Sequence, residues 1–307
     1  MNIVFFGNGS FGMPSLKKLY NSNYKLLCLI SNTPKSKSRK KNQKLPILQQ
    51  TANDLNIKII NQDVLTDINF INNLKSLNPD LFIVVSYKII PGILLDIPKY
   101  GSINLHASML PKYRGSSPIQ RALINGETEI GLTTFLLNSG IDKGDIIAQK
   151  KYKLNDRNTY TELHDKLAVK GSHIILDSIE SVASKDFVPK KQSNAKISYA
   201  KKINKNEYQI TFDANAFNLH NKIRGLTFPG CYCYYLNKRV KLFNTYYDNN
   251  ISIDLLKNIG DFTFENNSIY IKCKKGFLIV NELQFEGKKI IKAIDFKNMN
   301  LKKDFFN

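Results

Sequence analysis

The sequence of 307 residues has no tryptophan, only four cysteines and only four histidines. No two cysteines form a CxxC pair, and no cysteines and histidines cluster with the spacing of a zinc site. We therefore expect that neither a metal ion nor disulfide bonds stabilise the fold, and that the active site contains no metal. Reduced thiols are typical of a cytoplasmic protein, which is the location that we expect.

Membrane-targeting signals are also missing. The N-terminus enters a strand directly, with no basic region ahead of a long apolar stretch, so a secretory signal is not expected. The apolar segment Leu81–Leu95 contains Lys88 and Pro91 and is too short to cross a bilayer. A hydrophobic fraction of 42% still allows a packed core, and the length allows two domains.

Acidic residues are scarce relative to basic ones. The chain has 45 lysine and arginine residues against 25 aspartate and glutamate residues, a net charge of +20 at pH 7. Residues 35–44 carry six basic residues and no acid, and residues 201–307 carry 18 basic and 10 acidic residues. Such an excess favours a polyanionic partner, although a lysine-rich proteome would produce the same composition.

The first half of the chain alternates strand-like and helix-like segments. Helical patterns cover about 14–20, 67–77 and 160–182. Apolar strand candidates are Asn2–Phe6, Lys25–Ser31, Lys58–Ile60, Leu81–Ser86, Ser102–His106, Glu129–Leu137 and Ile146–Tyr152. Continuous apolar strands that alternate with helices predict an α/β domain whose mostly parallel sheet is covered on both faces.

The amino-acid composition of the chain changes after residue 183. A polar, lysine-rich stretch is followed by a short helical pattern at 214–223 and then by short β-like runs. These runs are Cys231–Tyr235, Lys238–Tyr246, Gly260–Glu265, Ser268–Lys272 and Phe277–Phe285. We therefore predict a catalytic domain at 1–185, a linker at 186–205 and a small β-barrel or sandwich domain at 206–307.

The segment Gly101–Arg121 holds the side chains that point to chemistry. Asn104 and His106 are two residues apart on a predicted strand, so their side chains share one face. They stand at the carboxyl end of that strand, where open α/β sheets bind their ligands. An amide that donates a hydrogen bond and an imidazole that transfers protons suit acyl or formyl transfer to an amine, which passes through an oxyanion.

A carboxylate is needed to orient such an imidazole. Asp142 is the best candidate, because it lies in the Gly-flanked loop Gly140–Asp145, where the backbone can approach a ligand closely. Asp145 in the same loop is the alternative. Taken alone, an Asn-x-His pattern more often reflects a buried histidine and a turn-capping asparagine than a catalytic pair.

The residues around this pattern make it specific. Asn104–Pro111 reads NLHASMLP and continues into KYRG and SSPIQRA, which resembles the signature of folate-dependent formyltransferases, most closely the branch that acts on methionyl-tRNA. The resemblance implies a Rossmann-like formyltransferase domain followed by an OB-like tRNA-binding domain. It also implies Asn104, His106 and Asp142 as catalytic residues.

The same resemblance implies the ligands. It places 10-formyltetrahydrofolate, the formyl donor and co-substrate, near Ser108, Met109, Leu110 and Pro111. It makes initiator methionyl-tRNA the acceptor, in translation initiation, with Arg39 as a contact to the tRNA. We expect Arg224 to contact a phosphate of the tRNA rather than to read a base. We also expect a monomer. The sequence departs from the family pattern at Gly7–Gly12, at Lys88 and at Asn138, positions that bear on the shape of the folate pocket.

Three alternatives stay open at this point. Gly7–Gly12 reads GNGSFG, a literal GxGxxG fingerprint, so an NADP-dependent oxidoreductase is possible, although no acidic residue ends the second strand. A formyltransferase that acts on glycinamide ribonucleotide or on an amino sugar would share the catalytic residues. A non-catalytic RNA-binding module would explain the charge but not the convergence of Asn, His and Asp.

Overall fold

The computed structural model describes residues 1–34, 45–298 and Phe306. The chain forms two compact units. Unit 1 consists of Met1–Pro118, Ile130–Tyr152 and His164–Tyr199, and unit 2 of Ile119–Glu129, Lys153–Leu163 and Ala200–Asn307. Most of the segment expected to be a linker, residues 186–199, thus belongs to unit 1. The functional boundaries at 1–185 and 206–307 stay predictions.

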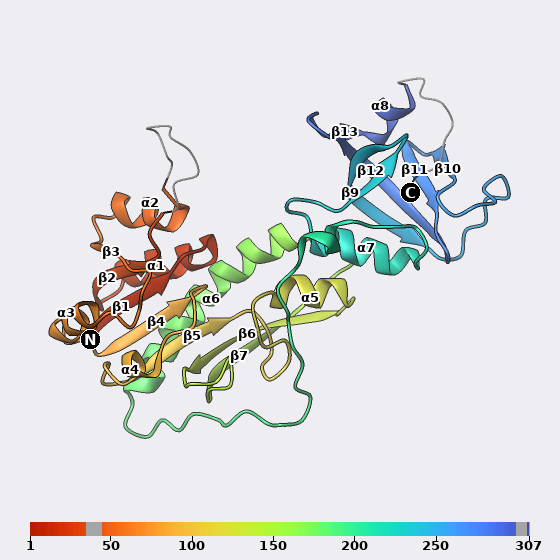
Figure 1. Ribbon diagram of the computed structural model, residues 1–307. Helices are drawn as coiled ribbons and strands as arrows, with labels where there is room; N and C mark the ends of the chain where they lie inside the picture. Colours follow the sequence, from red (N-terminus) through yellow and green to blue (C-terminus); the bar gives the residue numbers. More distant parts are fainter. Residues whose placement is uncertain (35–44, 299–305, 307) are drawn as a thin grey trace. The chain divides into compact units, whose positions relative to one another are not determined.

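Unit 1 is built on a seven-stranded sheet with the order β3-β2-β1-β4-β5-β6-β7 (Figure 1). Its strands are β1 (Asn2–Gly7), β2 (Lys25–Ser31), β3 (Ile59–Asn61), β4 (Leu81–Val85), β5 (Ser102–His106), β6 (Glu129–Leu136) and β7 (Ile146–Lys153). The pairings from β3 through to β5 are parallel, and β6 runs antiparallel to β5. The predicted α/β domain with a mostly parallel sheet is confirmed.

The central strands explain why this sheet forms. Ile3, Val4, Phe5 and Phe6 of β1 are fully buried, because β1 lies between β2 and β4 and both of its faces are covered. A strand buried on both faces favours a continuous apolar run over an alternating pattern. The carboxyl ends of the parallel strands therefore meet at one edge of the sheet, and β5 brings Asn104 and His106 to that edge.

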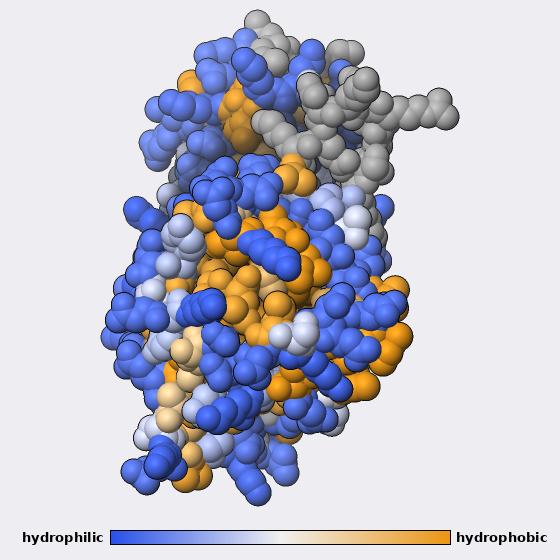
Figure 2. All heavy atoms as spheres, turned by 90° about the vertical axis from the view of Figure 1, so that its left-hand side faces the viewer, coloured by the Kyte–Doolittle hydropathy of each residue, from blue (hydrophilic) through white to orange (hydrophobic). Residues whose placement is uncertain are grey.

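Helices connect and cover the strands of unit 1. They are η1 (Ser10–Gly12), α1 (Met13–Tyr20), α2 (Ile47–Asp54), α3 (Ile68–Ser76), α4 (Gly92–Leu95) and α6 (Tyr160–Ala183), whose first turn is counted with unit 2. In α3, Phe70, Ile71 and Leu74 face the core, and the Asp67 carboxylate caps the N-terminus by accepting from Phe70 N. Seen from the side of α2 and α3, most of the surface is hydrophilic, with a hydrophobic area near the centre of the view and smaller hydrophobic areas around it (Figure 2).

Unit 2 contains an antiparallel sheet with the order β10-β11-β12-β9-β8, with β13 paired to β12. Its strands are β8 (Tyr232–Tyr235), β9 (Lys238–Asp248), β10 (Phe262–Glu265), β11 (Ser268–Lys272), β12 (Phe277–Phe285) and β13 (Ile291–Lys292). Its helices are α5 (Pro118–Ile124), η2 (Lys205–Tyr208), α7 (Ala216–Gly225) and α8 (Ala293–Lys297). The expected C-terminal β domain is confirmed.

The core of unit 2 combines aliphatic side chains with a cluster of aromatic rings. The rings of Tyr235, Phe262, Phe296 and Phe306 pack against one another with centroids 5.1–6.2 Å apart. All four cysteines are buried free thiols, and burial raises the pKa of Cys28 to about 11. Among the described residues, no helix combines the length and the apolar character needed to cross a membrane.

Candidate active site

Asn104 lies near the carboxyl end of β5 and is only partly buried. Its backbone pairs with Val84 on one side and Phe135 on the other, so the strand fixes the direction of the side chain. Within the described part of the chain, the side-chain amide of Asn104 makes no hydrogen bond. An amide that is rigidly placed and free of internal partners can donate to a ligand.

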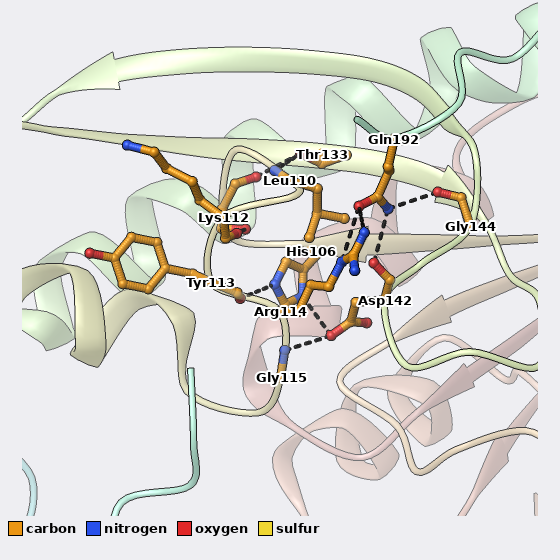
Figure 3. Close-up of polar contacts among 11 residues, drawn as sticks. His106, Leu110, Lys112, Tyr113, Arg114, Gly115, Thr133, Asp142, Gly144 and Gln192 are labelled. Atoms are coloured by element: carbon orange, nitrogen blue, oxygen red, sulfur yellow. Dashed lines mark hydrogen bonds and ion pairs between the residues drawn. The ribbon is translucent and has the colours of Figure 1, made fainter. Parts of the chain in front are cut away.

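His106 follows two residues later on the same face, and its side chain is only 7% exposed. Its Nε2 lies 2.8 Å from the backbone oxygen of Tyr113 (Figure 3). Because a carbonyl oxygen can only accept, Nε2 carries the hydrogen of this bond. In the neutral ring, Nδ1 is then the nitrogen that can take up a proton, and Nδ1 faces Asp142.

Asp142 places one carboxylate oxygen, Oδ2, 3.9 Å from Nδ1 of His106. The same oxygen accepts a hydrogen bond from Gly115 N at 2.7 Å. Asp142 has a φ of 50°, a left-handed conformation that aspartate tolerates better than most residues. No hydrogen bond or ion pair joins Asp145 to His106 among the described residues, so the structure pairs the ring with Asp142 rather than with Asp145.

The turn at Gly115 provides the donor that holds this carboxylate. Gly115 has a φ of 119°, which strongly favours glycine, and Tyr113 also has a positive φ of 59°. These two bends turn the Tyr113 oxygen toward His106 and the Gly115 N–H toward Asp142. The KYRG sequence therefore supplies the backbone partners of both functional side chains (Figure 3).

The loop expected to bind folate, Ser108–Pro111, is held by internal hydrogen bonds. Ser108 Oγ donates to Lys112 O at 2.6 Å, and Leu110 N donates to Thr133 Oγ1 at 3.2 Å. Gln149 Nε2 donates to Leu110 O at 2.9 Å. The side chains of Ser108 and Leu110 are buried, whereas Met109 is partly exposed. The loop is thus rigid, and its contact with folate stays a prediction.

Two of the three departures from the family pattern have local partners. Lys88 Nζ donates to the backbone oxygens of Gln62 at 3.0 Å and Asp63 at 2.7 Å, and burial lowers the pKa of Lys88. Asn138 Oδ1 accepts from Gly140 N at 2.9 Å, which tightens the start of the Asp142 loop. The Lys88 side chain therefore links the loop after β4 to the loop after β3.

Gln192 is a residue of this site that the sequence did not reveal. Its Nε2 donates to the backbone oxygens of Asp142 at 2.9 Å and Gly144 at 2.8 Å. Its Oε1 accepts from Nη2 of Arg114 at 2.7 Å and from Nε at 3.2 Å. Figure 3 shows Gln192 between the two loops that contact His106. A lone glutamine in a polar stretch gives no signal of this role.

The two arginines expected to contact tRNA are placed differently. Arg39 lies outside the described residues. Arg224, in α7 of unit 2, is 6% exposed and donates from Nη1 to the backbone oxygens of Asn155 at 3.0 Å and Asn158 at 3.1 Å. Burial lowers the pKa of Arg224. Its side chain thus has a structural task inside unit 2, and its contact with tRNA stays a prediction.

Arg121 of the SSPIQRA sequence also has a structural partner, within unit 2. Its guanidinium forms a two-pronged ion pair with Glu207, at 2.6 Å from Nη1 and 3.0 Å from Nη2. The hydrogen bond from Arg121 is the main cause of a lowered pKa of Glu207. Arg121 also donates to the backbone oxygens of Lys201 and Lys202, so it fastens the first residues of the C-terminal segment.

This pair makes part of the stability depend on pH. A carboxyl whose pKa is lowered by folding stabilises the protein above its unfolded value, 4.5 for Glu207, and this contribution is lost as pH falls through the folded pKa. We expect Arg121→Ala to lower the unfolding midpoint at pH 7 and to reduce the loss of stability from pH 5 to pH 3. Urea unfolding at both pH values measures this, with Lys205→Ala as control; parallel pH curves for Arg121→Ala and wild type would contradict it.

Metal ligands are not gathered at this site. Across the part of the chain that the structure describes, no three His, Cys, Asp or Glu side chains are arranged to hold a metal ion. The groups available for chemistry are therefore an amide donor, an imidazole with one free nitrogen, and a carboxylate beside it. This set can stabilise an oxyanion and move one proton.

Comparisons with known proteins agree with this chemistry. A formyl transferase family model matches residues 1–179, and a model of the formyl transferase C-terminal domain matches residues 202–301. The methionyl-tRNA formyltransferase of Thermodesulfovibrio yellowstonii is 37% identical over 297 residues, which cover 96% of this chain and 94% of that protein. The methionyl-tRNA formyltransferase of Clostridium novyi is 37% identical over 297 residues, which cover 95% of this chain and 95% of that protein.

Solved structures agree on the fold. A methionyl-tRNA formyltransferase from Clostridium thermocellum has a TM-score of 0.56 at 19% identity and covers 95% of this chain and 99% of that chain. The sugar 3N-formyl transferase WlaRD, crystallised with dTDP and 5-N-formyl-THF, has a TM-score of 0.64 at 24% identity, with coverage of 94% and 99%. The formyl transferase match over residues 1–179 also includes the GNGSFG loop and replaces the dinucleotide-binding interpretation.

Proposed function

Because this chain belongs to the methionyl-tRNA formyltransferase family, we propose that it transfers a formyl group from 10-formyltetrahydrofolate to the methionine amino group of initiator methionyl-tRNA. The observation that carries the proposal is full-length similarity, at up to 37% identity, combined with an Asn/His/Asp set at the carboxyl edge of the sheet. The net charge of +20 suits a polyanionic acceptor.

Each residue of the proposed trio has a distinct task. Bound 10-formyltetrahydrofolate supplies an electrophilic formyl carbon. The Asn104 amide donates to the oxygen of that carbon as the amine attacks and negative charge develops. His106 takes the amine proton on Nδ1, the nitrogen left free by the bond from Nε2 to Tyr113. Asp142, 3.9 Å from Nδ1, stabilises the resulting imidazolium.

The proton and the bonds balance over the reaction. A bond forms between the amine nitrogen and the formyl carbon, and the bond from that carbon to the folate nitrogen breaks. The proton held on Nδ1 of His106 passes to the departing folate nitrogen, so His106 ends the cycle neutral. Ser108–Pro111 borders the folate, and Arg39 and Arg224 contribute to tRNA binding in this proposal.

The proposal extends to the working form of the protein. We propose a monomer, because one chain supplies Asn104, His106 and Asp142. We propose a cytoplasmic location, because all four cysteines are free thiols and the acceptor is an aminoacyl-tRNA. Size-exclusion chromatography with light scattering tests the first point; a stable dimer at micromolar concentration would contradict it.

The function is tested with a panel of acceptors and one variant. Wild type should formylate initiator methionyl-tRNA with 10-formyltetrahydrofolate but not glycinamide ribonucleotide or a dTDP-linked amino sugar. Asn104→Ala should lower kcat for methionyl-tRNA about a hundredfold, because it removes an oxyanion donor. Asn72→Ala, an exposed asparagine of α3, is the control. Formylation of a small-molecule acceptor in preference to the tRNA would refute the assignment.

A further inference from the structure

The segment after α6 runs along the proposed catalytic site instead of crossing freely to the next domain. Lys190 forms a two-way backbone bridge with Ile146, at the start of β7. Ser198 accepts from Arg114 N through its backbone oxygen at 2.9 Å and from Tyr113 N through Oγ at 2.9 Å. Residues 190–198 are therefore fastened at both ends to unit 1, with Gln192 between the two anchors.

Gln192 uses both ends of its side chain. The two backbone oxygens of Asp142 and Gly144 can only accept, so the NH2 group must face them. The Arg114 guanidinium can only donate, so the carbonyl oxygen must face it. The hydrogen-bond pattern thus requires a side chain that is a donor at one atom and an acceptor at the other.

The buried side chain of Arg114 requires a hydrogen-bond acceptor at this position. Arg114 is only 5% exposed, and we find no carboxylate paired with it among the described residues. A buried guanidinium needs a hydrogen-bond acceptor, because a buried charged donor left without one destabilises the folded protein. Gln192 supplies one, which fixes the Arg114 side chain next to Tyr113.

The two loops joined by Gln192 supply the groups that face the two ring nitrogens of His106. The Arg114 loop carries Tyr113, whose oxygen accepts from Nε2, and the Asp142 loop carries the carboxylate beside Nδ1. We propose that Gln192 is a positioning residue for formyl transfer, which holds these two loops at the separation that keeps Nδ1 free and Asp142 3.9 Å from it. This inference rests on the function proposed above.

Substitutions at Gln192 can distinguish a role in positioning the catalytic groups from a role in the stability of the fold. Gln192→Glu keeps the acceptor for Arg114 but turns a second oxygen toward two carbonyl oxygens. Gln192→Met keeps the size of the side chain and removes both functions. We expect each variant to lower kcat about tenfold, since a small displacement of catalytic groups is costly, while KM for methionyl-tRNA and for the folate changes less than about threefold. The exposed neighbour Lys191 provides the control, Lys191→Ala.

The readout is kcat per folded molecule, with the folded fraction measured by circular dichroism, together with the pH profile of kcat. We expect a reduced kcat and a displaced pH profile in Gln192→Glu and Gln192→Met, because both partners of His106 move. Wild-type kcat per folded molecule in either variant, or a loss equal to that of Lys191→Ala, overturns the inference. A wild-type enzyme that does not formylate methionyl-tRNA refutes the proposed function instead.

Discussion

His106→Ala is expected to lower the rate of methionyl-tRNA formylation about a thousandfold. The substitution removes the group that takes the amine proton and the positive charge that forms beside the oxyanion; general acid–base catalysis alone contributes about 10²–10⁴-fold. It also leaves the Asp142 carboxylate without its neighbouring imidazole. Single-turnover formylation with charged initiator tRNA and 10-formyltetrahydrofolate measures the effect directly.

His173→Ala is the matched control for this prediction. His173 is exposed on α6, and its Nε2 lies 3.4 Å from Nζ of Lys18. It has no part in the proposed mechanism. We expect it to keep wild-type kcat, and we expect KM for tRNA in His106→Ala to change less than about threefold, because His106 is 6% exposed and has little surface for binding. A residual rate within tenfold of wild type would remove His106 from the mechanism.

The parts of the fold that could be predicted are those governed by local pattern. β5 was predicted at Ser102–His106 and is found there, and β1 and β4 follow from continuous apolar runs. Helix α2 was not predicted. Its N-cap residue Pro46 has no side-chain cap, and its apolar positions are few, so its stability depends on packing against the rest of unit 1, which no local pattern displays.

The site could be predicted only where chemistry requires particular residue types. Formyl transfer needs an amide, an imidazole and a carboxylate, but it is the resemblance of Asn104–Pro111 to formyltransferases that points to Asn104, His106 and Asp142, and their catalytic roles stay predictions. Gln192 could not be found, because its partners lie 48–78 positions away, and two of them are backbone oxygens that every residue possesses. Arg224 shows a second limit: the sequence suggests a contact with tRNA, which stays a prediction, but gives no sign that Nη1 donates to two backbone oxygens of a distant segment.

The loop that carries Asp142 depends on one close approach of backbone to backbone. A Cβ atom added to Gly144 would lie 1.6 Å from the backbone oxygen of Leu136, at the end of β6. No rotation of a side chain relieves this clash, because both groups are backbone. The loop is also paired there, since Leu136 N donates to Asp145 O at 2.9 Å. Any residue larger than glycine must therefore push the loop away from the sheet.

Gly144→Ala should consequently damage stability and catalysis together. We expect the free energy of unfolding of unit 1 to fall by about 3 kcal/mol, the upper end of the usual cost of overpacking. We also expect kcat per folded molecule to fall at least about a hundredfold, because a displacement of about 1 Å moves Asp142 away from Nδ1 and stretches the bonds from Gln192. Urea unfolding followed by formylation at a temperature where the variant is folded measures both effects.

Gly140→Ala, four residues earlier in the same loop, separates the backbone clash from the mere presence of a methyl group. A Cβ at Gly140 would meet the side chain of Lys143, at 2.8 Å from its Cδ. Lys143 is exposed and flexible, so it can turn aside, and we expect this variant to stay within about 1 kcal/mol and threefold of wild type. Equal behaviour of the two alanine variants would mean that the loop is not held against β6, and that the position of Asp142 does not depend on it.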